Sequence, residues 1–312
     1  MQEYYKNSKG ILYLGDALNL AEVIKPNSVQ CVVTSPPYWG KRAYGNEAEY
    51  AKIRDDTQLG LEKTPEQYIN RLVAIFNEIK KVLHPTGTLW VNIADTNCVP
   101  SSVRESVLKM NPGVPAKNRI GIPWKLAFAL QNDGWYLRAD LIWWKRNAPR
   151  EPVKDRPTYE HEYVFLLTKK QRYFYDNEAV APKYSGRYAG NRQKIVEESG
   201  GMFRGGHNIK AQLKYRNLGS VWDIPTEPHP DYHYAAFPVK LAERCIKAGT
   251  SEKGCCSKCF APIVPIREHE TKDAPIKTLG WKPSCECNAE IIPCTVLDPF
   301  MGRGQLRLQQ KH

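Results

Sequence analysis

The chain has 312 residues, a hydrophobic fraction of 42% and a formal net charge of +12. This length can bury a sizeable core, and no stretch approaches the roughly 20 apolar residues of a membrane-spanning helix, so we expect no membrane association. The positive charge suits a polyanionic partner. The N-terminus lacks the apolar region of a signal peptide, so we expect a cytoplasmic protein whose nine cysteines are free or metal-bound.

The N-terminal part of the chain contains two predicted strands, residues 11–14 and 29–33, which flank a short helix at residues 17–24. Asp16 is either a binding residue at the tip of the first strand or the N-cap of that helix. The second strand is apolar and runs directly into a Ser-Pro-Pro-Tyr motif at residues 35–38. A glycine- and charge-rich loop follows.

The next elements alternate between helix and strand. Thr64, Pro65 and Gln67 form a capping box with proline at the first helical position, which predicts the start of a long amphipathic helix. The elements after it are a buried strand at 88–93, a helix at 123–131 and an antiparallel edge hairpin of strands 135–144 and 163–167. This rhythm predicts an α/β fold with a doubly wound, mainly parallel sheet. Asp95 either lines a site or caps a helix.

Residues 168–219 differ from the rest of the chain. They contain eleven basic and four acidic residues, with aromatic residues interleaved. Cationic side chains neutralise phosphates and aromatic rings stack on exposed bases, so we favour contact with DNA over a merely solvated insertion. Lys210, Lys214 and Arg216 are the candidate DNA-binding residues.

The C-terminal part returns to regular structure. A short extended segment at 219–225 and a helix at 239–248 precede a strand at 295–297, which leads into an Asp-Pro-Phe-x-Gly-x-Gly motif at 298–304. Open α/β sheets bind ligands at the carboxyl ends of their strands. Because this motif and Ser-Pro-Pro-Tyr both follow short apolar strands, we expect them to lie at the same edge of one sheet.

The two motifs together resemble those of the DNA amino-methyltransferases, in the circularly permuted group whose catalytic motif precedes the cofactor motif. The resemblance implies a class I S-adenosylmethionine-dependent methyltransferase fold, double-stranded DNA as substrate, and a restriction–modification system with a cognate restriction endonuclease. It divides the chain into a catalytic part (1–167), a target-recognition insertion (168–219) and a cofactor-binding part (220–312) with a cysteine-rich insertion (251–290).

The resemblance assigns the base pocket to the first motif. Ser35 and the Pro36 carbonyl would accept the two hydrogens of an exocyclic amine, while Pro37 stiffens the loop. Tyr38 would stack on a base flipped from the duplex, and Trp39 would extend that wall. In this family Ser-Pro-Pro-Tyr is associated with N4 of cytosine, whereas Asp or Asn in place of the serine is associated with N6 of adenine. We therefore expect a cytosine-N4 enzyme, with adenine-N6 as the alternative.

The resemblance assigns S-adenosylmethionine to the second motif. Asp298 would lie near the amino-acid end of the cofactor and Phe300 would pack against it, while glycines let the backbone approach closely. The cofactor-binding residues so assigned are Asp16, Phe237, Pro238, Asp298, Phe300, Gly302 and Gly304.

The end of the chain departs from the family pattern. Arg303 stands where a serine is usual, and no acidic residue follows Asp298 to hold the ribose hydroxyls. We therefore expect a chain that is C-terminally truncated relative to the family. A catalytically inactive DNA-binding remnant is one alternative function, and methylation of RNA or of a smaller amine is another.

Four cysteines near the C-terminus have the spacing of a metal site. Two close pairs, Cys256-x-x-Cys259 and Cys285-x-Cys287, match a structural zinc site with four thiolate ligands and no open catalytic position. Unrelated reduced thiols are the alternative. Cys255 is a substitute ligand, and the loop around Gly280 is expected to form a knuckle-like turn. The remaining cysteines, which have no partner pattern, are Cys31, Cys98, Cys245 and Cys294.

Overall fold

A six-stranded sheet lies at the centre of the protein. The computed structural model describes residues 1–40, 58–98, 111, 113–182, 217–227, 237–268 and 277–301. The strands of the sheet, in spatial order, are β12 (Val296–Leu297), β3 (Val29–Thr34), β4 (Leu83–Ile93), β6 (His161–Thr168), β5 (Tyr136–Trp144) and β7 (Val221–Asp223). Strand β6 is antiparallel to both of its neighbours, and the other pairings are parallel. This confirms the mainly parallel α/β sheet.

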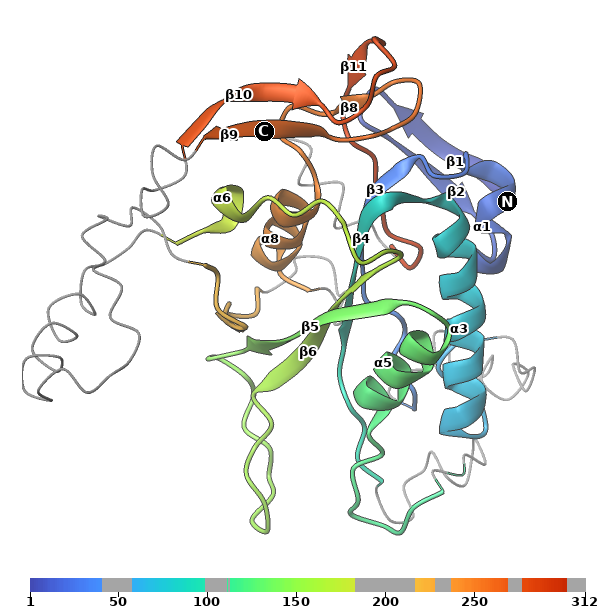
Figure 1. Ribbon diagram of the computed structural model, residues 1–312. Coiled ribbons are helices and arrows are strands. Elements are labelled where there is room, and N and C mark those ends of the chain that lie inside the picture. Colours follow the sequence, from blue (N-terminus) through green and yellow to red (C-terminus); the bar gives the residue numbers. More distant parts are fainter. Residues whose placement is uncertain are drawn as a thin grey trace, which may run out of the picture.

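Helices cover both faces of this sheet, which gives three layers (Figure 1). One face carries η1 (Ala17–Asn19), α1 (Leu20–Val23), α3 (Pro65–Val82) and α5 (Ile122–Asn132). The other face carries α6 (Asn177–Val180) and α8 (Val239–Gly249). Strand β3 is buried along its whole length, as expected for a parallel strand covered on both sides. None of the helices in the described ranges is long and apolar enough to cross a membrane.

Two helix ends have a clear local cause. The Thr64 side chain accepts a hydrogen bond from the Gln67 N–H, and the Gln67 side chain accepts one from the Thr64 N–H, which confirms the capping box of α3. On the opposite face, α8 ends at Gly249, where a Cβ atom would lie 2.3 Å from the Thr88 hydroxyl oxygen. Glycine is therefore required where α8 meets β4.

Three parts of the chain differ from the sequence expectations. The hairpin of β5 and β6 is antiparallel as expected, but it is not at the edge of the sheet, because β7 pairs with the outer side of β5. The first predicted strand is real, but β2 (Gly10–Leu14) pairs with β1 (Gln2–Asn7) in a separate antiparallel sheet. The prediction of a turn around Gly280 is wrong, because Gly280 lies inside β10 (Lys277–Pro283), at an irregularity in its pairing with β9 (Ile263–Glu268). The residues flanking β9 and β10 form another two-stranded sheet, of β8 (Cys255–Cys256) and β11 (Ile291–Ile292).

Candidate active site and cysteine cluster

The two sequence motifs begin at the carboxyl ends of neighbouring strands. In the parallel pair β12 and β3, Val296 lies opposite Cys31 and Leu297 opposite Val32. One residue further along, the Thr34 hydroxyl donates a hydrogen bond of 2.5 Å to Oδ1 of Asp298. The expectation that Ser35 and Asp298 lie at one edge of one sheet is thereby confirmed. Gly302 and Gly304 lie outside the described residues.

A network of polar side chains surrounds the Ser-Pro-Pro-Tyr loop. The Ser35 hydroxyl donates to the Tyr38 hydroxyl oxygen at 3.2 Å, and the Tyr38 hydroxyl donates to Oε2 of Glu162 at 2.6 Å. The Asn92 amide donates to the same carboxylate oxygen at 3.0 Å, and the Lys145 ammonium pairs with the other one. These residues lie on β4 and β6, or just after β3 and β5. The sheet register therefore brings them together.

Electrostatics fixes the protonation states in this network. Burial opposes ionisation of Glu162, but the Lys145 ammonium and the hydrogen bonds from Lys145, Tyr38 and Asn92 lower its pKa below the ordinary value. Burial, together with the negative charge of Glu162, raises the pKa of Tyr38 well above its usual range. At neutral pH Glu162 is thus an ionised acceptor and Tyr38 a neutral donor to it. Because Ser35 gives its proton to Tyr38, the lone pairs of its hydroxyl oxygen remain for a substrate hydrogen.

The two prolines and the tryptophan of the motif have separate environments. The Pro37 carbonyl accepts a hydrogen bond of 2.8 Å from the Tyr68 hydroxyl on α3, which anchors the loop. No donor among the described residues bonds to the Pro36 carbonyl. Trp39 is 3% exposed, and its indole N–H donates to the Glu62 carbonyl at 2.9 Å. The expectation that Trp39 lines the base pocket is wrong, since it is part of the core beside α3.

Only one of the two carboxylate oxygens of Asp298 accepts hydrogen bonds from the described residues. Its Oδ1 accepts from the Thr34 hydroxyl and from the Phe300 N–H at 3.0 Å, whereas Oδ2 makes no hydrogen bond to the described residues. Burial raises the pKa of Asp298 to about 6, although both hydrogen bonds act in the opposite direction. A partly buried carboxylate with one open oxygen fits a cationic or hydrogen-bond-donating ligand group, such as the ammonium of an amino-acid moiety.

Asp16, Phe237 and Pro238, which were also predicted to bind the cofactor, make contacts within the fold. The Asp16 carboxylate accepts from the Leu18 N–H at 2.9 Å, so the N-cap alternative is the one that is observed. Phe237 is buried in the same core cluster as Val33 and Leu241, and Pro238 precedes α8 as its N-cap. Contact of these three residues with a cofactor stays a prediction.

Of the two alternatives for Asp95, a helix cap is the one that is observed, although the helix is distant in the sequence. Its carboxylate accepts from the N–H groups of Gly121 and Ile122 at the start of α5, at distances of 2.9 to 3.1 Å. Arg119 donates to the same carboxylate at 2.8 Å. The carboxylate therefore caps a helix that begins 27 residues later and ties the loop after β4 to it.

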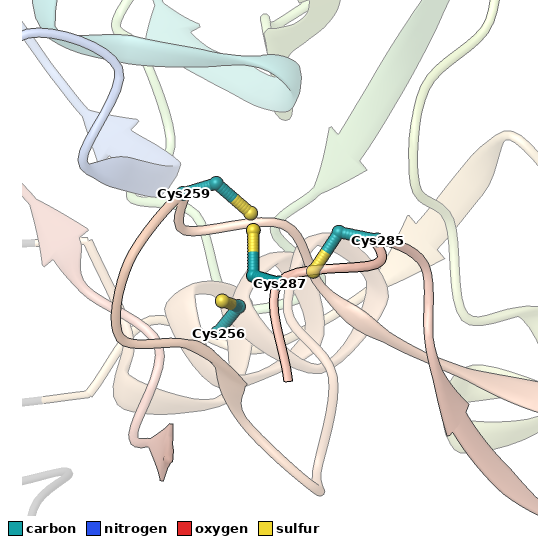
Figure 2. A group of neighbouring side chains, drawn as sticks. All are labelled: Cys256, Cys259, Cys285 and Cys287. Atoms are coloured by element: carbon teal, nitrogen blue, oxygen red, sulfur yellow. The ribbon is translucent and has the colours of Figure 1, made fainter. Parts of the chain in front are cut away.

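The four cysteines of the two close pairs come together (Figure 2). The sulfur atoms of Cys256, Cys259, Cys285 and Cys287 all lie within 4.8 Å of one another. Backbone N–H groups, chiefly that of Cys259, lower the pKa of Cys256 to about 6. Cys255 is outside this group. Its thiol donates to the Pro293 carbonyl at 3.7 Å.

Cys31 lies next to the first motif but is no nucleophile. It is fully buried, and this burial raises the pKa of its thiol to about 12.

Comparison with known proteins agrees with this geometry. The DNA methylase family matches residues 29–261, which span β3, α3, the hairpin of β5 and β6, α8 and the first cysteine pair. The chain belongs to this family. As a DNA methylase of this kind, it is an S-adenosylmethionine-dependent DNA methyltransferase.

Several relatives of this methylase are type II methyltransferases. M.Cfr9I of Citrobacter freundii is 43% identical over 251 residues, which cover 77% of this chain and 72% of the relative. M.SmaI of Serratia marcescens is 36% identical over 255 residues, which cover 78% and 76% of the two chains. The solved structure of the PvuII DNA methyltransferase (cytosine-N4-specific) is 18% identical, covers 81% of this chain and 74% of its own, and has a TM-score of 0.51. That likeness supports the fold.

Sequence reasoning missed the polar residues that hold the methylase's Ser-Pro-Pro-Tyr loop. The sequence alone assigned no role to Glu162, Asn92 or Lys145. Asn92 lies near the carboxyl end of a predicted strand, Lys145 directly follows one, and Glu162 directly precedes one. The available signal was a charged residue at the start of an otherwise apolar strand, since Glu162 precedes Tyr163-Val164-Phe165. A carboxylate in such a buried strand needs partners, and the structure shows them.

Proposed function

We propose that this methylase transfers the methyl group of S-adenosylmethionine to the exocyclic N4 amine of a cytosine flipped out of duplex DNA. The observation that carries the proposal is the hydrogen bond between Thr34 and Asp298. Thr34 directly precedes Ser35, so this bond holds the proposed base-binding residue Ser35 close to Asp298, the carboxylate that we assign to the cofactor. Alignment of donor and acceptor supplies most of the rate of such a transfer.

The amine of a nucleobase is a poor nucleophile, because its nitrogen lone pair is delocalised into the ring. Ser35 Oγ accepts one amine hydrogen and the Pro36 carbonyl accepts the other, which draws the nitrogen toward a tetrahedral geometry. S-adenosylmethionine supplies a methyl group activated by its positively charged sulfur. The new bond joins nitrogen to the methyl carbon, the carbon–sulfur bond breaks with its electron pair on sulfur, and the amine releases one proton to solvent.

We assign Glu162 as a positioning residue for this acceptor pair. It orients the Tyr38 hydroxyl, which in turn receives the Ser35 proton. With that proton directed inward, the outward-facing lone pairs of Ser35 are the only part of the hydroxyl left for the substrate. The ring of Tyr38 stacks on the flipped base, as aromatic residues do in enzymes that act on extruded bases.

The assignment of cytosine rests on Ser35, because serine at this position is the family's form for the N4 amine. Adenine N6 is the alternative. Duplex DNA is bound in this proposal by the basic segment 168–219, whose candidate contacts Lys210, Lys214 and Arg216 lie outside the described residues. The relatives' type II names support a restriction–modification context, with a cognate endonuclease as the partner.

The test is methyl transfer from labelled S-adenosylmethionine to unmethylated plasmid DNA, followed by mass spectrometry of the nucleosides. N4-methylcytosine is the expected product. Formation of N6-methyladenine would support DNA methyl transfer but overturn the assignment of cytosine from Ser35. DNA binding without product would identify an inactive remnant, and a preference for RNA over duplex in competition would replace the substrate class.

A further inference from the structure

The cysteine cluster lies at the amino end of the sheet, away from the catalytic motifs. Gln30 is at the start of β3 and Ser35 follows its end, so about 16 Å of strand separates them at roughly 3.3 Å per residue. In Figure 1 the small sheets formed by β8 to β11 lie at one end of the central sheet, and the loop between β5 and β6 lies at the other. A direct catalytic role for the cluster is therefore excluded by distance.

The backbone around the cluster has the features of a built metal site. The four sulfur atoms lie within 4.8 Å of one another, close to the separations of about 3.8 Å that four thiolates adopt around zinc at about 2.3 Å. Phe260, directly after Cys259, has φ +63°, and its N–H donates to the Cys256 carbonyl at 2.9 Å. A left-handed conformation is unusual for so bulky a residue and marks a turn held by its surroundings.

A glycine and a β pairing hold the segment next to the first cysteine pair in place. Gly254 has φ +86°, and a Cβ atom there would lie 2.3 Å from the Ile292 carbonyl oxygen. Only glycine therefore permits β8 and β11 to approach each other at this point. The first cysteine pair is thus attached to the segment that runs directly into β12.

A buried glutamine in β3, Gln30, connects the cysteine unit to the start of β12. Gln30 is 3% exposed, and its side-chain amide donates to the Phe260 carbonyl at 3.0 Å. Its side-chain oxygen accepts from the Thr295 N–H at 2.7 Å, and its backbone N–H donates to the Thr295 carbonyl at 3.0 Å. Thr295 immediately precedes β12, and Asp298 follows three residues later. The side chain of Gln30 therefore bonds both to the turn after Cys259 and to the residue directly before β12.

We propose that Cys256, Cys259, Cys285 and Cys287 bind one structural zinc ion, and that this ion fixes β12 and Asp298 for cofactor binding through the Gln30 bridge. Four thiolates in a closed tetrahedral arrangement select zinc over hard cations and leave no open coordination position. The ion holds the Phe260 carbonyl where Gln30 reaches it. The second half of this inference rests on the proposed cofactor role of Asp298, whereas the metal site does not.

The first measurement is the metal content of the purified protein by mass spectrometry. About one zinc per chain is expected. The paired change Cys285→Ser and Cys287→Ser should abolish zinc binding, whereas Cys98→Ser, at a thiol outside the cluster, should retain it. A folded wild-type protein without stoichiometric metal, or with iron in place of zinc, would overturn the metal assignment.

The second measurement separates the bridge from the ion. Gln30→Met keeps the size of the side chain and all four thiols but removes both side-chain hydrogen bonds. Zinc should remain at about one per chain, while the dissociation constant for S-adenosylmethionine in calorimetry rises by roughly tenfold and DNA affinity stays unchanged. Unchanged cofactor affinity in Gln30→Met would refute the coupling. Zinc retention in a protein that makes no methylated product would instead refute the proposed function and leave the metal site standing.

Discussion

The two ends of the central sheet organise their polar chemistry in different ways. At the carboxyl end, Glu162, Tyr38, Asn92 and Lys145 come from four strands or their tips and satisfy one another. At the amino end, the thiols come from two short segments on either side of the β9–β10 hairpin. The first arrangement depends on strand register, and the second on local spacing. Catalytic positioning is therefore a property of the whole sheet, whereas the metal site belongs to one insertion.

The largest expected effect is loss of transfer from the carboxyl end. Ser35→Ala removes the acceptor for the amine hydrogen, and losing one such preorganised contact costs about 100- to 1000-fold in rate. Tyr38→Ala should have an effect at least as large, with cofactor binding near normal in both variants. Ser28→Ala is the matched control, because Ser28 is just before the other end of β3 and bonds to the Lys25 carbonyl.

Single-turnover methyl transfer, together with calorimetric binding of S-adenosylmethionine, measures this difference. If Ser35→Ala and Tyr38→Ala lost cofactor binding and transfer equally, the base and cofactor pockets would have been assigned to the wrong motifs.

Glu162→Gln should reduce both stability and rate. It leaves the Lys145 ammonium, which is 20% exposed, without its partner, and breaking a buried ion pair costs on the order of 3 kcal/mol. Misplacement of Ser35 should lower transfer by about 10- to 100-fold. Adding Lys145→Met should restore much of the free energy of unfolding but not the rate.

The control for this network is the exposed pair of Lys247 and Glu243 on α8. Glu243→Gln should change the free energy of unfolding by less than about 1 kcal/mol and leave the rate unchanged. Denaturant unfolding and single-turnover kinetics on both variants decide the matter. An equal rate in Glu162→Gln and wild type would remove the positioning role.

Asp298 should couple cofactor binding to pH. Its pKa of about 6 lies above the ordinary value, so in the free protein its ionisation lowers the free energy of unfolding as pH rises toward 6. A bound ammonium favours the ionised form. Cofactor affinity should therefore fall by up to about tenfold per pH unit below pH 6.

Asp298→Asn retains the Oδ1 acceptor for Thr34 but carries no charge. The variant should be more stable than wild type above pH 6 by about 1–3 kcal/mol, and its weak cofactor binding should lose the pH dependence. Calorimetry and thermal unfolding between pH 5 and pH 8 provide the readout. A pH-dependent affinity that persists in the variant would point to another titrating group.

The smallest effects are expected at the two capping aspartates. Asp16→Ala removes one hydrogen bond at a partly exposed cap and should lower stability by about 1 kcal/mol. Asp95→Ala removes the cap of α5 and the partner of Arg119, so its cost should be larger, about 2 kcal/mol. A weaker affinity for S-adenosylmethionine in Asp16→Ala but not in Asp95→Ala would support the predicted contact of Asp16 with the cofactor.

Local chemistry made much of this protein predictable. The capping box placed the start of α3, apolar runs placed β3 and β4, and the two motifs were correctly expected at one edge of the sheet. Glycine misled at residue 280, because a glycine inside a strand and a glycine in a turn have the same sequence signal. Trp39 misled because a buried tryptophan needs only one acceptor, which Glu62 supplies.

The sequence by itself determined the elements, the two motifs and the spacing of the four thiols, since each depends on residues close together in the chain. Only the tertiary structure decided which polar groups meet. Tyr38 bonds to a residue 124 positions away, and Gln30 to one 230 positions away. Such contacts follow from strand order, register and the burial that forces polar groups to find partners, and no local pattern encodes them.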